Sequence, residues 1–435
     1  MKIAIVGAGI SGLGAALALA ERHDVRLFER DGRAGGHANT VDATFGAALQ
    51  PVDTGFIVYN YRNYPNLTAL FDHLGVETEW SDMSFGFSLD AGRCEYACDN
   101  LDKVFAQRWR VADPRFIGVV REILRFTKIG PADLAEGRLE GMSLSDWLGR
   151  RGFSRWFRDR FLLPMGGAIW STSVTRMLEF PAEHFLRFFA NHDLMTGLDP
   201  AQRWRTVTGG SREYVRKVHT ALGPRVELGR AVASVETGAG SPLLRFADGG
   251  AERFDQIVIA THGPEARGLL ATPDAQQARL LETFQTSRNR AVLHSDPALM
   301  PRRRKVWSSW NFLADRNEVE TTRPAQVTYW MNRLQNIPED RPLFVSINPR
   351  REPAADLTHY EVSYGHPLYD GHTFAAQREM DQIQGRHGVW YAGAWLGFGF
   401  HEDGLRAGLR VASALGARPD WAVDLGKTHL RAHAA

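Results

Sequence analysis

Three glycines near the N-terminus have the spacing of a dinucleotide-binding turn. The apolar run Lys2–Val6 is typical of a buried parallel strand, and Gly7, Gly9 and Gly12 follow it before an alanine-rich helical stretch. Gly7 permits a tight turn, Gly9 lets the backbone approach a pyrophosphate, and Gly12 lets the helix pack closely on the strand. The free N–H groups at the helix N-terminus would then receive the phosphates.

An acidic residue follows the second predicted strand of this unit. The run Val25–Phe28 ends at Glu29, about twenty residues beyond the glycines, where a carboxylate can hold ribose hydroxyls. The strand, helix and acid favour a dinucleotide site over a structural βαβ unit with chance glycines. We expect further cofactor contacts from the helix start, at Ile10 and Ser11, and from Arg30.

The segment after the acid narrows the cofactor to FAD. Gly35 and Gly36, followed by His37, resemble a loop of the flavoprotein superfamily of amine oxidases, phytoene desaturases and protoporphyrinogen oxidase. The resemblance implies a non-covalent FAD whose diphosphate and ribityl chain pass this loop, with His37 at a position that is usually basic. It also implies that the backbone at Thr54, Gly55 and Phe56 lies under the flavin ring; an ordinary β-turn is the alternative.

A second motif of this superfamily lies near the C-terminus. The sequence predicts a strand at Val389–Ala392, a glycine loop, and a helix that opens at Glu402, Asp403 and Gly404. The resemblance implies that this helix directs its N-terminus at the pyrimidine end of the flavin. It also assigns cofactor contacts to Val232, Ala260 and Gly393.

Composition excludes several classes of protein. The 435 residues are 44% hydrophobic and 23% charged, with a net charge of +2, which is ordinary for a globular protein and does not favour nucleic acid. Cys94 and Cys98 have neither a redox nor a zinc spacing, so we expect no metal. No apolar run approaches a membrane span, and the chain opens on a predicted strand; we therefore expect a cytoplasmic protein.

The positions of the two motifs predict an α/β fold with two discontinuous domains. A Rossmann-like FAD-binding domain, with a parallel sheet and a β-meander, is expected from residues 1–75, 205–285 and 385–420. An α+β substrate domain is expected from residues 76–204 and 286–384, with a C-terminal tail at 421–435. Strands predicted at 291–294, 305–312, 327–331 and 343–347 would roof the flavin, lined by candidates Trp307, Trp310, Asn311, Phe312, Tyr329, Trp330 and Asn332.

Two arginine-containing segments allow two interpretations each. Phe153–Trp170 alternates arginines with aromatic residues, which fits a hydrophobic substrate tunnel or membrane-surface opening, but fits better an amphipathic helix packed on the core. Arg302–Lys305 would hold a carboxylate, a phosphate or a lipid headgroup, although a solvated turn is the simpler interpretation.

A narrower resemblance points to lipids. The stretches DTGFIVYNYRNYPNL, MGGAIWSTS and GFGFHEDGLRAG resemble a branch associated with cyclopropane-fatty-acid-synthase-like methyltransferases and with methyl-branched and furan fatty acids. It implies an unsaturated or methyl-branched acyl chain as substrate, a lipid methyltransferase as partner, and a place at the inner membrane surface. Amine oxidases usually carry an acid after the glycine at Gly393, where this chain has Ala394 and Trp395, and a flavin-side lysine that has no clear equivalent here.

The catalytic candidates follow from flavin chemistry. Hydride loss to a flavin needs a C–H bond beside nitrogen or in an allylic position, and a base takes the second hydrogen as a proton. His401 is the first candidate base and His262 the second, each with a structural histidine as the alternative. Trp395, Phe398 and Phe400 would form an apolar pocket against the flavin. Three functions remain open: a lipid dehydrogenase or isomerase, an amine or amino-acid oxidase, and a non-catalytic flavoprotein partner of a lipid-modifying enzyme.

Overall fold

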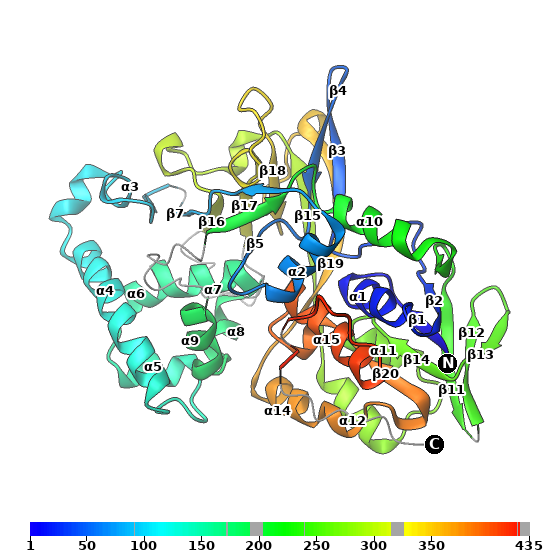
Figure 1. Cartoon of the computed structure of the whole chain (residues 1–435). Helices are drawn as coiled ribbons and strands as arrows, with labels where there is room; N and C mark the ends of the chain where they lie inside the picture. The colour runs from blue at the N-terminus through cyan, green and yellow to red at the C-terminus, as the bar shows by residue number, and fades with distance from the viewer. Residues whose placement is uncertain are drawn as a thin grey trace.

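The computed structural model describes residues 1–90, 92–170, 173–191, 203–238, 240–314, 326–423 and 425–426. It has the predicted α/β fold, built on one parallel sheet and one mixed sheet. In Figure 1 the parallel sheet lies with helices α1 and α15, while helices α3 to α9 gather on the opposite side of the molecule. The mixed sheet lies between these helices and the long β3–β4 hairpin.

The parallel sheet is assembled from distant parts of the chain. Its order is β10-β2-β1-β14-β20, that is Val226–Glu227, Asp24–Phe28, Lys2–Val6, Gln256–Ile259 and Val389–Tyr391. The central strands are almost wholly buried, as the apolar runs predict. Helix α1 (Ile10–Leu19) follows β1, and α15 (His401–Ala414) packs against it. A Cβ atom at Gly408 would lie 2.1 Å from the Ser11 carbonyl oxygen, so only glycine allows this close approach.

The predicted meander is present. Its strands are β11 (Val232–Gly238), β12 (Gly240–Phe246) and β13 (Ala251–Arg253). Strand β10 comes just before the meander in the chain but is not part of it, because β10 pairs in parallel with β2. The backbone N–H groups of Gly229 and Arg230 bond to the carbonyls of Asp31 and Glu29, which keeps the chain running beside β2.

The mixed sheet has seven strands in the order β19-β15-β18-β17-β16-β7-β8. In that order they span Thr358–Pro367, Thr286–His294, Phe344–Ile347, Gln326–Trp330, Trp310–Ala314, Phe85–Leu89 and Cys94–Ala97. Three of the four predicted strands are confirmed; the fourth begins only at Trp310, because Arg304–Val306 forms a 3-10 turn. Strand β19 was not predicted.

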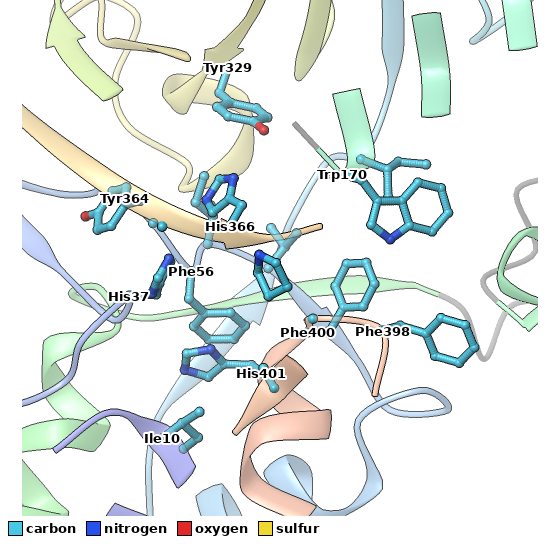
Figure 2. Close-up of a pocket in the computed structure, with 18 of the residues that line it drawn as sticks. Ile10, His37, Phe56, Trp170, Tyr329, Tyr364, His366, Phe398, Phe400 and His401 are labelled. Atoms are coloured by element: carbon cyan, nitrogen blue, oxygen red, sulfur yellow. The ribbon is translucent and has the colours of Figure 1, made fainter. Parts of the chain in front are cut away.

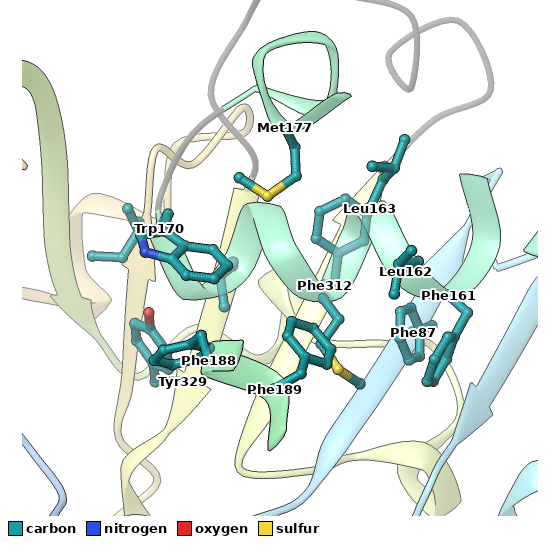
Figure 3. Close-up of a cluster of buried hydrophobic side chains, with 14 of the residues drawn as sticks. Phe87, Phe161, Leu162, Leu163, Trp170, Met177, Phe188, Phe189, Phe312 and Tyr329 are labelled. Carbon is teal, nitrogen blue, oxygen red and sulfur yellow. The ribbon is translucent and has the colours of Figure 1, made fainter. Parts of the chain in front are cut away.

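A layer of helices covers one side of the mixed sheet. It contains α3 (Leu101–Val104), η1 (Arg108–Ala112), α4 (Pro114–Ala135), α5 (Leu144–Arg150), α6 (Arg155–Phe157), a π-turn at Arg158–Leu162, α7 (Leu163–Trp170), α8 (Val174–Glu179) and α9 (Ala182–Asn191). Figure 3 shows side chains of the π-turn and α7 against Phe87, Phe312 and Tyr329 of the sheet. The segment 153–170 packs on the core as predicted, and four of its side chains also line the cavity described below. Its Arg155 and Arg158 pair with Asp159.

The remaining elements connect these layers. They are β3 (Thr40–Phe45), β4 (Ala48–Asp53), β5 (Tyr59–Asn60), α2 (Pro65–Leu74), β6 (Thr78–Trp80), β9 (Trp204–Val207), α10 (Arg212–Leu222), α11 (Gly263–Leu269), α12 (Ala275–Thr283), α13 (Met331–Leu334) and α14 (Gly371–Glu379). The Arg302–Lys305 turn is held by acids, since Arg303, Arg304 and Lys305 pair with Glu95, Glu339 and Asp102.

The predicted C-terminal tail is packed at its start. Ala422 and Leu425 are buried, and the Val423 N–H donates to the Asn66 side chain. The tail prediction is therefore wrong for these residues, because they cover α2; residues 427–435 lie outside the described part. Among the described residues, no helix combines the length and apolar character that crossing a bilayer requires.

Candidate active site

One cavity of about 1500 Å³ connects the glycine turn after β1 with helix α4. Its lining includes most of the residues predicted as sites: Gly7, Gly9, Ile10, Ser11, Glu29, Arg30, Gly35, Gly36, His37, Gly55, Phe56, Val232, Ala260, His262, Gly393, Trp395, Phe400 and His401. Figure 2 draws 18 of the lining residues, and its labels run from Ile10 at one end to Trp170 at the other. Gly12, Thr54, Glu402, Asp403 and Gly404 do not line it.

The glycine turn has the geometry that its spacing predicts. Gly7 has φ +102°, and a Cβ atom on Gly12 would lie 1.9 Å from the Gly7 carbonyl oxygen. Gly12 therefore acts by letting α1 close on β1, outside the cavity. A Cβ atom on Gly9 would meet no atom within 4 Å, which leaves the start of α1 open to a phosphate.

The Glu29 carboxylate stands at the end of β2 on the cavity wall. Its Oε2 accepts from the Ala8 N–H at 2.8 Å and its Oε1 from the Asp31 N–H at 3.0 Å. These bonds fix the acid beside the glycine turn. Arg33 and Arg230 also line this end, and Arg230 donates to Glu227 and covers the Phe246 ring. Sequence reasoning missed both arginines, because no motif marks them.

The second glycine pair lies against the first glycine turn. Gly35 and Gly36 have φ +113° and +57°, and a Cβ atom on Gly36 would lie 3.2 Å from the Gly9 Cα. Gly55 packs on the same loop, since its Cβ atom would lie 2.2 Å from the His37 carbonyl oxygen. This close approach explains the glycine better than an isolated β-turn does. Thr54 is buried beside Gly55, and its hydroxyl bonds to Asn39 and Tyr364.

Three imidazoles meet on the cavity wall. His37 stacks on Tyr364 with ring centroids 4.8 Å apart and lies 5.6 Å from both His262 and His366. Burial lowers the pKa of His366 to about 4 and the pKa of His37 well below its usual range. Burial also lowers the pKa of His262. The cluster is therefore neutral at neutral pH. Tyr364 and His366 were not predicted as site residues, because the strand that carries them, β19, was not predicted.

His401 is held between two aromatic residues. Its ring stacks on Phe56 at 3.8 Å with an interplanar angle of 7°, and its Nε2 lies 2.7 Å from the Tyr214 hydroxyl. Burial lowers the pKa of His401 to about 3. Because this nitrogen already has a partner and binds a proton so weakly, His401 is poorly suited to be the base. The structural alternative fits it better.

The acids at the start of α15 hold the fold together, which corrects their assignment to the cofactor. Glu402 accepts from the Asn66 backbone and side chain and from the Leu67 N–H, so its carboxylate caps α2. Asp403 accepts from the N–H groups of Phe398 and Phe400 and shapes the glycine loop. Gly404 lets α15 approach Ile10, 2.8 Å from its would-be Cβ atom. The N-terminus of α15 itself still faces the cavity through Phe400 and His401.

Trp395 replaces the usual acid with an apolar wall. Its indole N–H donates to the Thr261 carbonyl at 3.0 Å, and its ring packs on Phe284 at 4.4 Å. A Cβ atom on Gly393 would collide with this indole, at 2.2 Å from its Nε1. Phe398 and Phe400 also line the cavity and lie near each other in Figure 2. Phe400 stacks on Phe188 of α9 at 4.9 Å.

The far part of the cavity is an apolar arm. One face of α4 supplies Phe116, Val119, Val120, Ile123 and Leu124, at the spacing of a single helical stripe. The opposite wall consists of apolar and aromatic residues from β8, β16, β17, the π-turn, α7 and α9: Tyr96, Phe161, Met165, Ile169, Trp170, Phe188, Trp310 and Tyr329. Trp307 and Trp330, predicted to line the cavity, instead pack with Met300 and Phe344.

The charged groups on the cavity wall are already engaged. Of the described lining acids, Glu29 bonds to backbone, while Asp31 and Glu265 pair with Arg30. The other two, Asp82 and Asp99, pair with Arg333 and Lys103. The described lining contains no lysine, and Lys305 pairs with Asp102 away from the cavity. The polar end of the cavity fits a dinucleotide, whereas the apolar arm offers a cation no unpaired carboxylate.

Comparison with known proteins agrees with this geometry. The family model described as flavin containing amine oxidoreductase matches residues 10–333. A search of curated proteins gave no match. A putrescine oxidase triple mutant superposes with a TM-score of 0.68 at 17% identity, covering 96% of this chain and 99% of that one.

Two further solved structures have the same fold. A CLA-producing fatty acid isomerase from P. acnes gives a TM-score of 0.66 at 15% identity, with 94% of this chain and 96% of that chain covered. A putative protoporphyrinogen oxidase from Exiguobacterium sp. 255-15 also gives 0.66, at 13% identity, covering 95% and 98%. The chain belongs to the flavin containing amine oxidoreductase family and is an FAD-dependent oxidoreductase.

Proposed function

We propose that the protein dehydrogenates or isomerises an activated position of a hydrophobic substrate, an unsaturated or methyl-branched acyl chain of a lipid. The observation that carries this proposal is the apolar arm, whose walls of valine, isoleucine, phenylalanine and tryptophan continue from the cofactor end of the cavity. Such walls suit a hydrocarbon chain and contribute binding through burial of its methylene groups. The solved structure of a fatty acid isomerase with the same fold is consistent with it.

Each part of the site has a role in this chemistry. The glycine turn, Glu29 and the His37 loop would hold FAD, which supplies a two-electron acceptor for hydride when bound. Trp395 and Phe400 exclude water beside it, and the apolar arm orients the acyl chain. His262 stays the candidate for the base, because its ring lines the cavity and is neutral at neutral pH.

Amine oxidation is the second candidate, since the family model and the putrescine oxidase structure both point to it. Two features of the site weigh against it. The Phe188 and Phe400 rings contact each other at 4.9 Å and 15°, which leaves no gap for an amine between them. The described lining also lacks both a lysine and an unpaired acid.

Anaerobic absorbance spectroscopy of the purified holoprotein tests the proposal. Detergent-dispersed unsaturated or methyl-branched phospholipids and a panel of amines would be mixed with it, and loss of the oxidised flavin band followed. Bleaching by lipid and not by amines is the expected result. Bleaching by an amine alone would overturn the proposal. We further propose that the substrate is drawn from the inner membrane surface, with a lipid methyltransferase acting on the same lipid.

A further inference from the structure

The apolar arm ends among exposed apolar side chains. Leu101 and Leu124 both line the cavity and are 73% and 61% exposed. Trp109 and Val111 of η1 are 60% and 59% exposed, and the Arg108–Asp102 ion pair ties η1 to α3. Four of the ten exposed large hydrophobic side chains in the described residues therefore belong to the consecutive elements α3, η1 and α4, and two of the four line the cavity. We name Leu101, Trp109, Val111 and Leu124 the mouth patch.

Positive charge surrounds the mouth patch. Residues 99–128 contain seven lysines and arginines and four acids, whereas the whole chain carries a net charge of only +2. The four acids are engaged: Asp99 with Lys103, Asp102 with Arg108, Asp113 with Arg110, and Glu122 with the Ser154 backbone. Seven cations and four acids give this stretch a net charge of +3.

Helix α4 brings the two properties together. Arg121 and Lys128 are exposed and lie three and four residues from Leu124, so they share one face with it. Arg125 instead donates to the Arg151 carbonyl and lies over the Phe153 ring. Val120 and Ile123, on the adjoining face, line the cavity. Leu124 stands at the boundary between the cationic face and the cavity wall. In Figure 1, α3 and α4 lie at the edge of the molecule, on the side away from α1 and β1.

We propose that the mouth patch and the α4 cations dock the protein on an anionic phospholipid bilayer, so that an acyl chain passes from the bilayer directly into the apolar arm. Exposed Trp and Leu side chains enter the interfacial region, while arginine and lysine pair with lipid phosphates. This inference rests on the proposed function and specifies where its substrate is taken up. Neither the 153–170 arginines nor the Arg302–Lys305 turn is needed, because acids or aromatic rings already engage them.

Vesicle flotation of the holoprotein tests the docking surface. The vesicles contain phosphatidylcholine alone or with phosphatidylglycerol. The wild type is expected to float with the anionic vesicles, and Trp109→Ser with Val111→Ser is expected to reduce the bound fraction about tenfold. Neither residue lines the cavity. Arg121→Ser with Lys128→Ser is expected to remove the preference for the anionic vesicles.

A matched control uses exposed apolar residues elsewhere. Leu49 and Val423 are 64% and 60% exposed, and Leu49→Ser with Val423→Ser is expected to bind as the wild type does. Equal flotation of the control and the Trp109/Val111 variant would overturn the inference. Failure of the wild type to bind any vesicle would also overturn it. In that case, a wild-type dimer in sedimentation that the Trp109/Val111 variant does not form would identify the patch as a contact between two copies of the chain.

The docking inference and the proposed function fail separately. Reduction of the flavin by detergent-dispersed lipid requires no docking, so it is expected to be the same in the Trp109/Val111 variant and the wild type. Loss of reduction by dispersed lipid in the wild type, with variant-sensitive flotation retained, would remove the proposed substrate and leave the docking surface in place. Reduction of the flavin by dispersed lipid without flotation of the wild type would keep the proposed substrate and remove the docking surface.

Discussion

The two ends of the cavity are built in opposite ways. At the cofactor end, each important residue acts through backbone geometry or a single polar group, as Gly7, Gly12 and Glu29 do. In the apolar arm, no one residue is decisive, and side chains from α4, α7, α9 and three strands share the wall. A site that binds a dinucleotide thus tolerates little change, whereas a wall that contacts a hydrocarbon chain depends on its total shape and volume.

The largest effect is expected at the cofactor end. Gly12→Ala places a methyl group 1.9 Å from the Gly7 carbonyl oxygen, so β1 and α1 must separate. We expect a loss of about 3 kcal/mol in stability and a protein without FAD. Gly9→Ala meets no protein atom within 4 Å, so it is expected to fold normally and bind FAD about tenfold more weakly.

Flavin absorbance after desalting and thermal unfolding check this pair of variants. Gly32→Ala is the control, because Gly32 is exposed, has no atom within 4 Å of its would-be Cβ and lies outside the cavity. FAD retention by Gly12→Ala at the wild-type level would show that the close packing of α1 on β1 is not required.

The next effect is expected in the apolar arm. Val120→Trp with Ile123→Trp fills the arm without touching the cofactor end, so FAD content should stay unchanged. Reduction of the flavin by a long-chain lipid should slow about tenfold or more. Ala132→Trp, on the exposed side of the same helix, is the matched control. Equal slowing in the control would mean that α4 acts through stability and not through the arm.

A smaller effect is expected at Glu402, which lies at the start of α15 and caps α2. In the native protein the Leu67 N–H donates a hydrogen bond of 2.9 Å to the Glu402 carboxylate. Glu402→Gln retains one oxygen acceptor but turns its NH2 group toward this N–H. The unpaired donor should cost about 1–3 kcal/mol in the free energy of unfolding. Denaturant unfolding measures the change. Glu339→Gln, with a side chain 73% exposed, should cost close to nothing, and an equal effect of both changes would contradict the capping role.

The last effect appears only in acid. The pKa of His401 is about 3 in the folded protein and about 6.5 when unfolded, so the unfolded chain takes up the proton first as the pH falls. The stability that neutral His401 contributes is complete above about pH 6.5 and is lost toward pH 3, at up to about 1.4 kcal/mol per pH unit. Denaturant midpoints between these values measure the slope, which His401→Gln should reduce by one proton. An unchanged slope would contradict the burial of a neutral ring.

The sequence predicts the cofactor end well because each role is local. A glycine is needed where a Cβ atom would collide, and Gly7, Gly12 and Gly55 show such collisions. The arm could not be predicted in the same way, since Val119 or Ile123 in a helix fits a core as well as a cavity wall. Glu402 was misassigned because its partner, α2, lies 336 residues away, a separation that no local pattern reveals.

The order of strands in the parallel sheet has a consequence for how the protein is made. Strand β1 leaves the ribosome long before its neighbour β14 and the outer strand β20 do. Since a parallel sheet forms only when its distant strands meet, β1 must wait while the helices of residues 101–191 fold locally. The glycine turn therefore closes only after β14 has been synthesised, and a chain truncated before β14 would keep this apolar strand available to chaperones or to aggregation.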